Sequence, residues 1–289
     1  MRKPDSYHPA AAFCFFLSVI LVTMLSQHPF VSAVSLVCSV AYFSALPVKR
    51  PFRVHLFSLI LFLILTLINP LFSKSGVTVL FYFNHRPITM EALLYGLNAA
   101  AALTAALYWF RCFSHIMTSD KLMYLFSRLS RKLGLVLTMA LRFIPLFKEQ
   151  YRKISDTQKA LGLYMDGNIV DSIKGRLRVT DILITWVLEG GIVTAQSMEA
   201  RGCMTGRRTF YSRYRILPFD VVLLILCAVF TALSVAAIYT ADFRFYPAIT
   251  YHGSVWTYAG FVSFVLLCLL PLIIHTQEVL RWQFLKSKI

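Results

Sequence analysis

The chain has 289 residues, of which 58% are hydrophobic and 15% are charged, and its mean hydropathy is +0.66. A soluble globular domain carries fewer apolar residues and about a quarter charged ones, so the composition excludes that class and indicates a membrane protein. The net charge of +16 fits basic cytoplasmic loops that attract anionic membrane lipid. Neither zinc-finger spacing nor a basic–aromatic strand pattern accompanies the charge, so we expect no nucleic-acid partner.

Six apolar segments have the length expected of membrane spans, because about 20 helical residues cross the hydrocarbon of a bilayer. They are Pro9–Ser26, Pro29–Leu46, Val54–Phe72, Ile88–Phe110, Ile216–Thr240 and Val255–His275. The stretch Val77–Phe83 is short and β-prone, which predicts a hairpin strand. The predicted fold is all-α: a polytopic membrane protein with about six transmembrane helices and a cytoplasmic module of amphipathic helices.

The distribution of basic residues predicts the orientation, because Lys and Arg gather in cytoplasmic segments. With both termini inside, the inner segments hold 26 Lys and Arg and the outer segments hold 3. Residues 111–215 alone hold 18 of them. We therefore expect membrane helices 1–4 in residues 1–110, a cytoplasmic module in 111–215, and membrane helices 5–6 with a cytoplasmic tail in 216–289.

The cytoplasmic module contains helical patterns that do not suit a membrane span. Leu133–Phe147 is apolar but short and is bent by Pro145, so we expect it along an interface or in a core. After Pro145, one apolar helical face is formed by Phe147, Tyr151, Ile154, Leu161 and Met165. Gly162 and Asp166–Asn168 are stop signals for this helix.

A second cytoplasmic helix is expected from about Thr180 to Cys203. A stripe of mostly small residues on it consists of Gly190, Thr194, Ser197 and Arg201. Such a stripe suits a groove from which the guanidinium projects.

Sequence signals of catalysis are missing. The chain has no phosphate-binding Gly-rich loop, no nucleophile elbow and no clustered histidines, so we expect no catalytic, metal or cofactor site and no enzyme. Apart from Glu91 near a span end, we expect no carboxylate inside an apolar span. Because ionisable groups inside the membrane mark ion pathways, this speaks against an independent secondary transporter.

Several motifs in order resemble one family. They are Met139–Leu146, Glu149, Thr157–Gly162, Ala195–Gly202 and Arg208-Thr-x-Tyr211. Together they resemble the transmembrane T component of energy-coupling factor (ECF) transporters, a family that includes the cobalt-uptake T subunits. The resemblance implies a non-catalytic scaffold in a bacterial plasma membrane. It would join two ABC-type ATPase subunits to a small substrate-binding membrane S subunit for vitamin or transition-metal-ion uptake.

In that family, two coupling helices each end in an Ala-Arg-Gly-like tripeptide that contacts an ATPase. The resemblance therefore assigns ATPase coupling to two groups of residues. They are Glu199, Ala200, Arg201 and Gly202, and Gln158, Lys159, Ala160, Leu161 and Gly162. An arginine fork can form charge-assisted, bidentate hydrogen bonds with a carboxylate.

Leu161 departs from the family pattern, which has arginine there. Two interpretations stay open: simple packing on the apolar helix face, or an apolar plug in a modified ATPase groove. Lys159 is a candidate for the missing charge. The departure suggests two different ATPase subunits. Arg201 taken alone could also be an interfacial arginine, and Glu199 a local surface charge.

Two other classes of function are the alternatives. An independent secondary transporter would move its substrate without partners, and a membrane-embedded enzyme would need a polar cluster at one membrane face.

Overall fold

The computed structural model describes residues 8–47, 51–72, 76–83, 86–163, 169–203, 218–240, 242–245, 250–252 and 255–286. The chain divides into two compact units. The first consists of Met1–Lys121 with Tyr214–Ile289 and is here called the membrane unit. The second, Leu122–Arg213, is here called the helical arm unit. The Asp166–Asn168 stop signal and the Arg208–Tyr211 motif lie outside the described residues.

The membrane unit consists of long apolar helices and two short hairpins. The helices are α1 (Pro9–Leu25), α2 (Pro29–Ala45), α3 (Pro51–Phe72), α4 (Met90–Ile116), α8 (Pro218–Thr240) and α9 (Val255–Lys286). Each of the six predicted apolar segments thus contains one of these helices, and the predicted all-α polytopic fold is confirmed. By length and composition, α3, α4, α8 and α9 qualify as membrane spans, whereas α1 and α2 are shorter apolar helices.

Local sequence signals explain where several of these helices begin. The first residue of α1 and of α2 is a proline, which has no amide hydrogen to leave unpaired there. The preceding residues, His8 and His28, act as N-caps: each Nδ1 accepts a hydrogen bond from a first-turn amide at 3.2 Å. Thr89 caps α4 in the same way, through its hydroxyl oxygen and the amide of Ala92.

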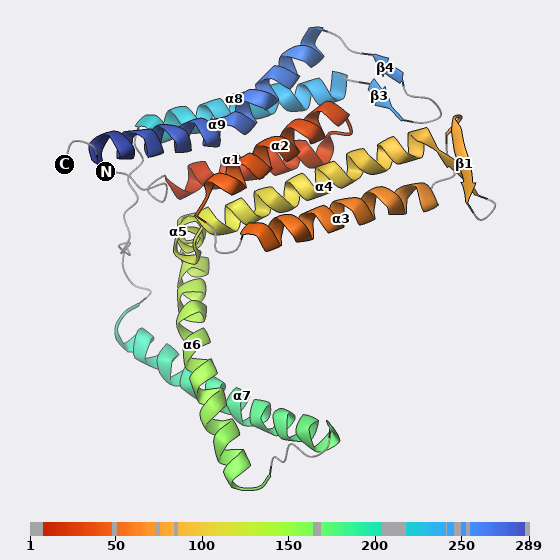
Figure 1. Cartoon of the computed structure of the whole chain (residues 1–289). Coiled ribbons are helices and arrows are strands. Elements are labelled where there is room, and N and C mark those ends of the chain that lie inside the picture. Colours follow the sequence, from red (N-terminus) through yellow and green to blue (C-terminus); the bar gives the residue numbers. More distant parts are fainter. Residues whose placement is uncertain are drawn as a thin grey trace. The chain divides into compact units, whose positions relative to one another are not determined.

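Helix α4 organises the membrane unit. It packs against α1, α2 and α3, while α8 and α9 pair with each other and contact α1 and α2 respectively (Figure 1). Trp109 of α4 is completely buried, and its ring contacts those of Phe15, Phe16 and Tyr42 at centroid distances of 6.0 to 6.1 Å. Aromatic packing thus joins α1, α2 and α4.

Polar groups also link these helices, in what we call the polar seam: five buried residues (Thr23, Ser32, Ser35, Asn98 and Trp109) and the backbone carbonyl of Gln27. The Trp109 indole donates to the Ser35 hydroxyl at 3.0 Å, and this hydroxyl lies 2.9 Å from that of Thr23. The Ser32 hydroxyl donates to Asn98 Oδ1, and Asn98 Nδ2 donates to the carbonyl of Gln27 at 2.7 Å. These bonds cross between segments that apolar contacts alone would leave free to slide.

Each hairpin lies between two membrane helices. The strands β1 (Val79–Phe83) and β2 (Arg86–Thr89) pair antiparallel before α4, and β3 (Asp242–Arg244) and β4 (Thr250–His252) pair before α9. The predicted strand at 77–83 is confirmed from Val79 onward. Glu91 holds the chain beside this hairpin, because its Oε1 accepts from the amide and hydroxyl of Thr78 at 3.2 and 2.9 Å.

One expectation about the spans is wrong. Asp220 is a second carboxylate within a span, in the first turn of α8, and only 1% of it is exposed. Like Glu91, it lies at the N-terminal end of its helix, where the helix dipole favours negative charge. Asp220 lies near the start of the predicted span Ile216–Thr240, and the expectation overlooked it because a long apolar run follows.

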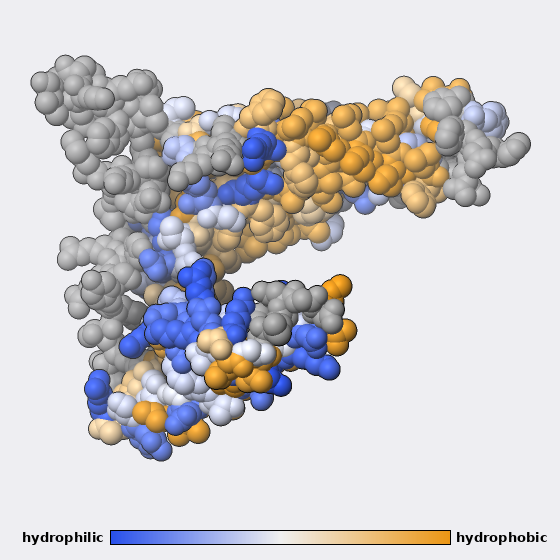
Figure 2. Space-filling model, turned by 60° about the horizontal axis from the view of Figure 1, so that its bottom comes forward, coloured by the Kyte–Doolittle hydropathy of each residue, from blue (hydrophilic) through white to orange (hydrophobic). Residues whose placement is uncertain are grey.

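The helical arm unit contains most of α5 (Ser119–Leu129), whose first three residues belong to the membrane unit, and all of α6 (Arg131–Ala160) and α7 (Ile169–Ala200). On the face shown in Figure 2, hydrophobic side chains predominate over much of the membrane helices, whereas hydrophilic and hydrophobic side chains are mixed over this unit. Helix α5 turns back on the start of α6, where the Thr138 hydroxyl donates to the sulfur of Met123 at 3.3 Å.

The two long helices of the arm unit begin earlier in the chain than the sequence predicted, and α6 ends at Ala160, before Leu161, which the predicted helix face included. Helix α6 runs through Pro145, although a proline inside a helix removes one backbone hydrogen bond. Aromatic contacts hold the turns around it: Phe143 stacks on Phe147 at 5.4 Å, and Phe147 meets Trp186 of α7 edge-on at 6.4 Å. Helix α7 begins at Ile169 instead of Thr180, because its charged first half still buries Gly175 and Val179.

Candidate functional site

The first group of candidate residues forms the end of α6. The amide of Gly162 donates to the carbonyl of Lys159 at 3.0 Å. The amide of Leu163 donates to the carbonyl of Gln158 at 3.1 Å. Gly162 has φ of 69°, in the left-handed region that favours glycine. These two bonds and this φ define a Schellman cap, which ends the helix and satisfies its last carbonyls.

The second group forms the same cap at the end of α7. The amide of Gly202 donates to the carbonyl of Glu199 at 2.9 Å. The amide of Cys203 donates to the carbonyl of Met198 at 3.0 Å. Gly202 has φ of 67°. The two helix ends therefore share one backbone geometry.

This equivalence pairs the side chains of the two ends. Leu161 and Arg201 both occupy the C-cap position, and both side chains are exposed. Two residues earlier, Lys159 on α6 corresponds to Glu199 on α7. The two caps thus have the same backbone geometry but different side chains. Arg201 is cationic where Leu161 is neutral, and Glu199 is anionic where Lys159 is cationic.

The structure assigns every predicted site residue to one of these two ends. Gln158, Lys159 and Ala160 close α6, with Leu161 and Gly162 in its cap; Glu199 and Ala200 close α7, with Arg201 and Gly202 in its cap. Of these, Gln158 and Gly202 are half-buried, and the other seven are exposed. Exposed side chains on an ordered turn are available for contact with a partner.

A hollow of about 500 Å³ lies between α6 and α7, beside the second cap. Leu135, Met139 and Phe143 line it from α6, and Thr194, Met198 and Glu199 line it from α7. Sequence reasoning missed this hollow. The spacing of four residues between its members on α6 indicates a common helix face, but only the crossing of the helices creates the space.

One charge pair lies on the surface of α6. Lys153 Nζ is 2.7 Å from Glu149 Oε1, one helical turn apart. The hydrogen bond from Lys153 and its positive charge hold the pKa of Glu149 below the ordinary value. The stabilisation that this pair gives is therefore present at neutral pH and is lost as the pH falls through the pKa of Glu149.

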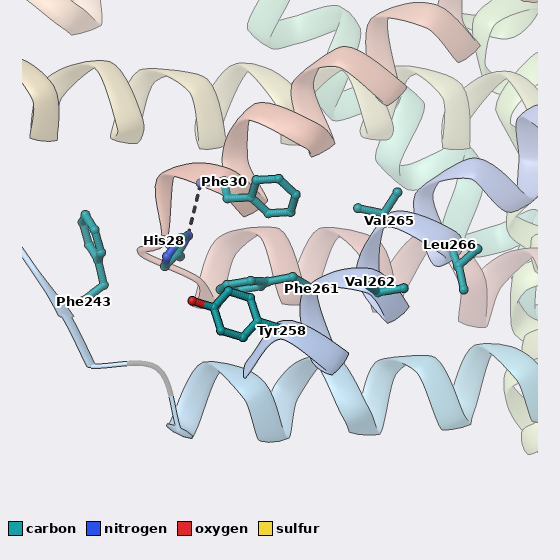
Figure 3. Close-up of a pocket in the computed structure, with 8 residues that line it drawn as sticks. All are labelled: His28, Phe30, Phe243, Tyr258, Phe261, Val262, Val265 and Leu266. Atoms are coloured by element: carbon teal, nitrogen blue, oxygen red, sulfur yellow. Dashed lines mark hydrogen bonds between the residues drawn. The ribbon is translucent and has the colours of Figure 1, made fainter. Parts of the chain in front are cut away.

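The membrane unit has a hollow of its own, about 570 Å³ in volume. Figure 3 shows His28, the N-cap of α2, and Phe30 in the first turn of α2 facing the first turns of α9, with Phe243 of β3 nearby. The His28 ring contacts Phe243 and Phe261 at centroid distances of 4.9 and 4.5 Å. Sequence reasoning missed this site too, because its lining comes from three segments far apart in the chain.

None of the described residues form a group of three or more His, Cys, Asp or Glu side chains that could hold a metal ion.

Comparison with known proteins identifies the family. Residues 6–211 match the family of cobalt transport proteins, CbiQ. This match covers more than half of the chain. The chain belongs to the CbiQ family. The predicted family resemblance is confirmed, and the protein is accordingly a helical protein of membrane transport.

A curated relative is also similar to part of this CbiQ-family chain. It is the energy-coupling factor transporter transmembrane protein EcfT of Streptococcus equi subsp. equi (strain 4047), and the identity is 28% over 93 residues. The similarity covers 32% of this chain and 34% of the relative. The chain thus matches about a third of the relative's length.

Proposed function

We propose that this CbiQ-family protein is the transmembrane T component of an ECF importer. It is a non-catalytic scaffold that joins two ABC-type ATPase subunits to a small substrate-binding membrane subunit. Residues 1–110 and 216–289 form its membrane part, and residues 111–215 form the coupling module. It lies in the bacterial plasma membrane, with both termini and the coupling module in the cytoplasm.

The observation that carries this proposal is the pair of matched helix ends. Two long helices, α6 and α7, each end in a glycine-closed Schellman cap with an exposed C-cap side chain. A Schellman cap fixes the backbone of the helix end, so the C-cap side chain has a defined position relative to its helix. On α7 this residue is Arg201, whose guanidinium can bind an ATPase carboxylate in a bidentate manner.

The transported substrate is proposed at the level of its class. The cobalt transport description of the family supports a transition-metal ion. The similarity to the EcfT protein supports an ECF transporter, and the motif resemblance keeps vitamins as the other substrate class. Substrate recognition belongs to the S subunit in this proposal. The T component transmits the ATP-driven movement of the ATPases to the S subunit.

A second candidate function is an independent secondary transporter. The buried carboxylates of Glu91 and Asp220 favour it, because ionisable groups inside the membrane mark ion pathways. The hydrogen bonds from Thr78 to Glu91 give that carboxylate a structural role instead. We therefore prefer the T component.

Replacement of Arg201 tests the proposal. Arg201→Ala should weaken retention of the ATPase by about tenfold to a hundredfold, since a hydrogen bond to a charged group contributes about 1.5–3 kcal/mol. The measurement is the amount of ATPase that co-purifies with the tagged chain, together with substrate uptake by cells. Arg178→Ala is the matched control, because Arg178 is an exposed arginine earlier on α7. Equal retention by both variants would refute the coupling role of Arg201.

A further inference from the structure

The hollow of the membrane unit opens onto the surface that α9 presents to lipid. Tyr258, Val262 and Leu266 line it, and 57%, 60% and 44% of these side chains are exposed. They recur every four residues, so they share one face of the helix. The segment Val255–Ile274 qualifies as a membrane span by length and composition, and the exposed face of a span meets hydrocarbon. The hollow is therefore continuous with the lipid-facing surface of α9.

The polarity of the lining changes along this face. His28 comes directly before α2 and Tyr258 lies in the first turn of α9, so both polar side chains lie near the ends of membrane helices. Figure 3 shows the Tyr258 hydroxyl on the side of the hollow where His28 lies. Val262, Val265 and Leu266 follow farther along α9 and are aliphatic. The hollow thus has a polar end near the membrane surface and an apolar wall that runs into the membrane.

Water is a poor occupant for this hollow. A bound water needs about two to four polar partners, whereas the lining side chains other than His28 and Tyr258 are apolar. An empty hollow is also unfavourable, because wall atoms without a neighbour lose their dispersion contacts. Hydrocarbon from the surrounding bilayer can cover the apolar wall without leaving a polar group unpaired.

The dimensions of the wall suit one lipid acyl chain. From Tyr258 to Leu266 the helix rises about 12 Å, at about 1.5 Å per residue, and the hydrocarbon of one leaflet is about 15 Å deep. The volume of about 570 Å³ lies within the range of small-molecule sites, about 300–1,000 Å³. We propose that the hollow is a binding site for one membrane phospholipid. One acyl chain lies against Val262, Val265 and Leu266, and the glycerol ester group lies beside His28 and Tyr258.

Aromatic packing fixes the shape of the hollow. The His28 ring contacts both Phe243 and Phe261, and the rings of Phe30 and Phe261 have a centroid distance of 5.5 Å. The bond from the Phe30 amide to His28 Nδ1 holds the imidazole as well. A preformed site binds its ligand at a lower cost in ordering, so this hollow should retain lipid longer than the rest of the lipid-facing surface.

Photo-labelling of the full chain tests this inference. The chain is reconstituted in phosphatidylcholine vesicles that contain a small fraction of a phosphatidylcholine with a diazirine on one acyl chain. Mass spectrometry then identifies the labelled residues. We expect stronger labelling of residues 28–30 and 258–266 than of Leu63 and Leu67 on α3, which are also exposed.

A tryptophan in the hollow gives the decisive variant. Val262→Trp fills the space, so labelling of residues 28–30 should fall to the level of α3. Val229→Trp is the matched control, because Val229 is an exposed valine of the α8 span that does not line the hollow. Since both valines are exposed, neither tryptophan disturbs the fold.

Three results would overturn the inference. The first is equal labelling of the hollow and of α3, and the second is labelling of residues 28–30 that Val262→Trp leaves unchanged. The third is labelling that the isolated chain shows and that the complex with its co-purified partner subunits loses, because the hollow would then be an interface with a protein.

The polar end of the hollow has its own test. Tyr258→Phe removes the hydroxyl and keeps the ring, so labelling by the phospholipid should fall about twofold to tenfold through the loss of one hydrogen bond. A diazirine-bearing alkane, which has no headgroup, should label the hollow of both chains equally. Phospholipid labelling that Tyr258→Phe leaves unchanged would contradict the assignment of the ester group to this end.

Discussion

Gly162 and Gly202 each close a helix by adopting the left-handed backbone conformation. Their positive φ values of 69° and 67° let each helix stop in one residue and turn its C-cap side chain outward. Any other residue pays a steric cost in this conformation, because its Cβ approaches the following carbonyl. The backbone geometry of both candidate contact sites thus depends on these two glycines.

Substitution of Gly202 should loosen the end of α7. Gly202→Ala costs about 1–2 kcal/mol in the left-handed conformation, so amide hydrogens in the last turn should exchange about fivefold to thirtyfold faster. Gly190→Ala is the control: Gly190 is helical, a Cβ there meets no described atom within 4 Å, and alanine favours the helix. Hydrogen exchange read by mass spectrometry should show opposite effects. Similar exchange in both variants would contradict the cap.

Individual site residues were predictable where a local signal exists. Glycine after a periodic helix is such a signal: Gly162 was named as a stop signal, and α6 ends just before it, at Ala160. The second helix was expected to run to about Cys203 and ends at Ala200. The hollow beside Glu199 was not predictable, because Met139 and Met198 meet only through the crossing of two helices. Nothing in the local sequence encodes that crossing.

At the scale of elements, tertiary contacts decide where local signals are overruled. A proline lacks the amide that the helix needs, yet α6 continues past Pro145, where Phe143, Phe147 and Trp186 pack around that turn. The apolar helices were predictable from hydropathy, because the thickness of the bilayer's hydrocarbon sets the length of a spanning apolar helix. Their ends were less so: α4 continues to Ile116 and α9 to Lys286, past the apolar residues that define the prediction.

The polar seam should stabilise the packing of α4 against α2 and the α1–α2 connection. Asn98→Ala removes its bonds to Ser32 and to the carbonyl of Gln27. An interhelical hydrogen bond in a membrane contributes about 0.6–1.7 kcal/mol, so the free energy of unfolding should fall by about 1–3 kcal/mol. Unfolding of the full chain in detergent measures it.

Ser44→Ala is the control for this prediction. The Ser44 hydroxyl donates only to the carbonyl of Val40 in its own helix, at 2.8 Å, so its loss should leave helix packing unchanged. Equal stability of the Asn98 and Ser44 variants would contradict a stabilising role for the seam.

At the scale of the whole molecule, the chain separates a membrane unit from a helical arm unit. The arm unit carries many of the Lys and Arg residues and both capped helix ends. The membrane unit contains the long apolar helices, the polar seam and the buried carboxylates of Glu91 and Asp220. This division suits a protein that receives force on one unit and moves the other. The sequence predicted a polar module at residues 111–215, since charge and hydropathy are summed over many residues.

Uptake into vesicles tests the central claim most directly, namely that the energy comes from ATPase partners. The purified chain is reconstituted alone, or together with its co-purified ATPase and S subunits, and labelled substrate is followed with ATP or with an ion gradient. We predict uptake only by the complete complex and only with ATP hydrolysis. Uptake by the chain alone, driven by a proton or sodium gradient, would contradict the account.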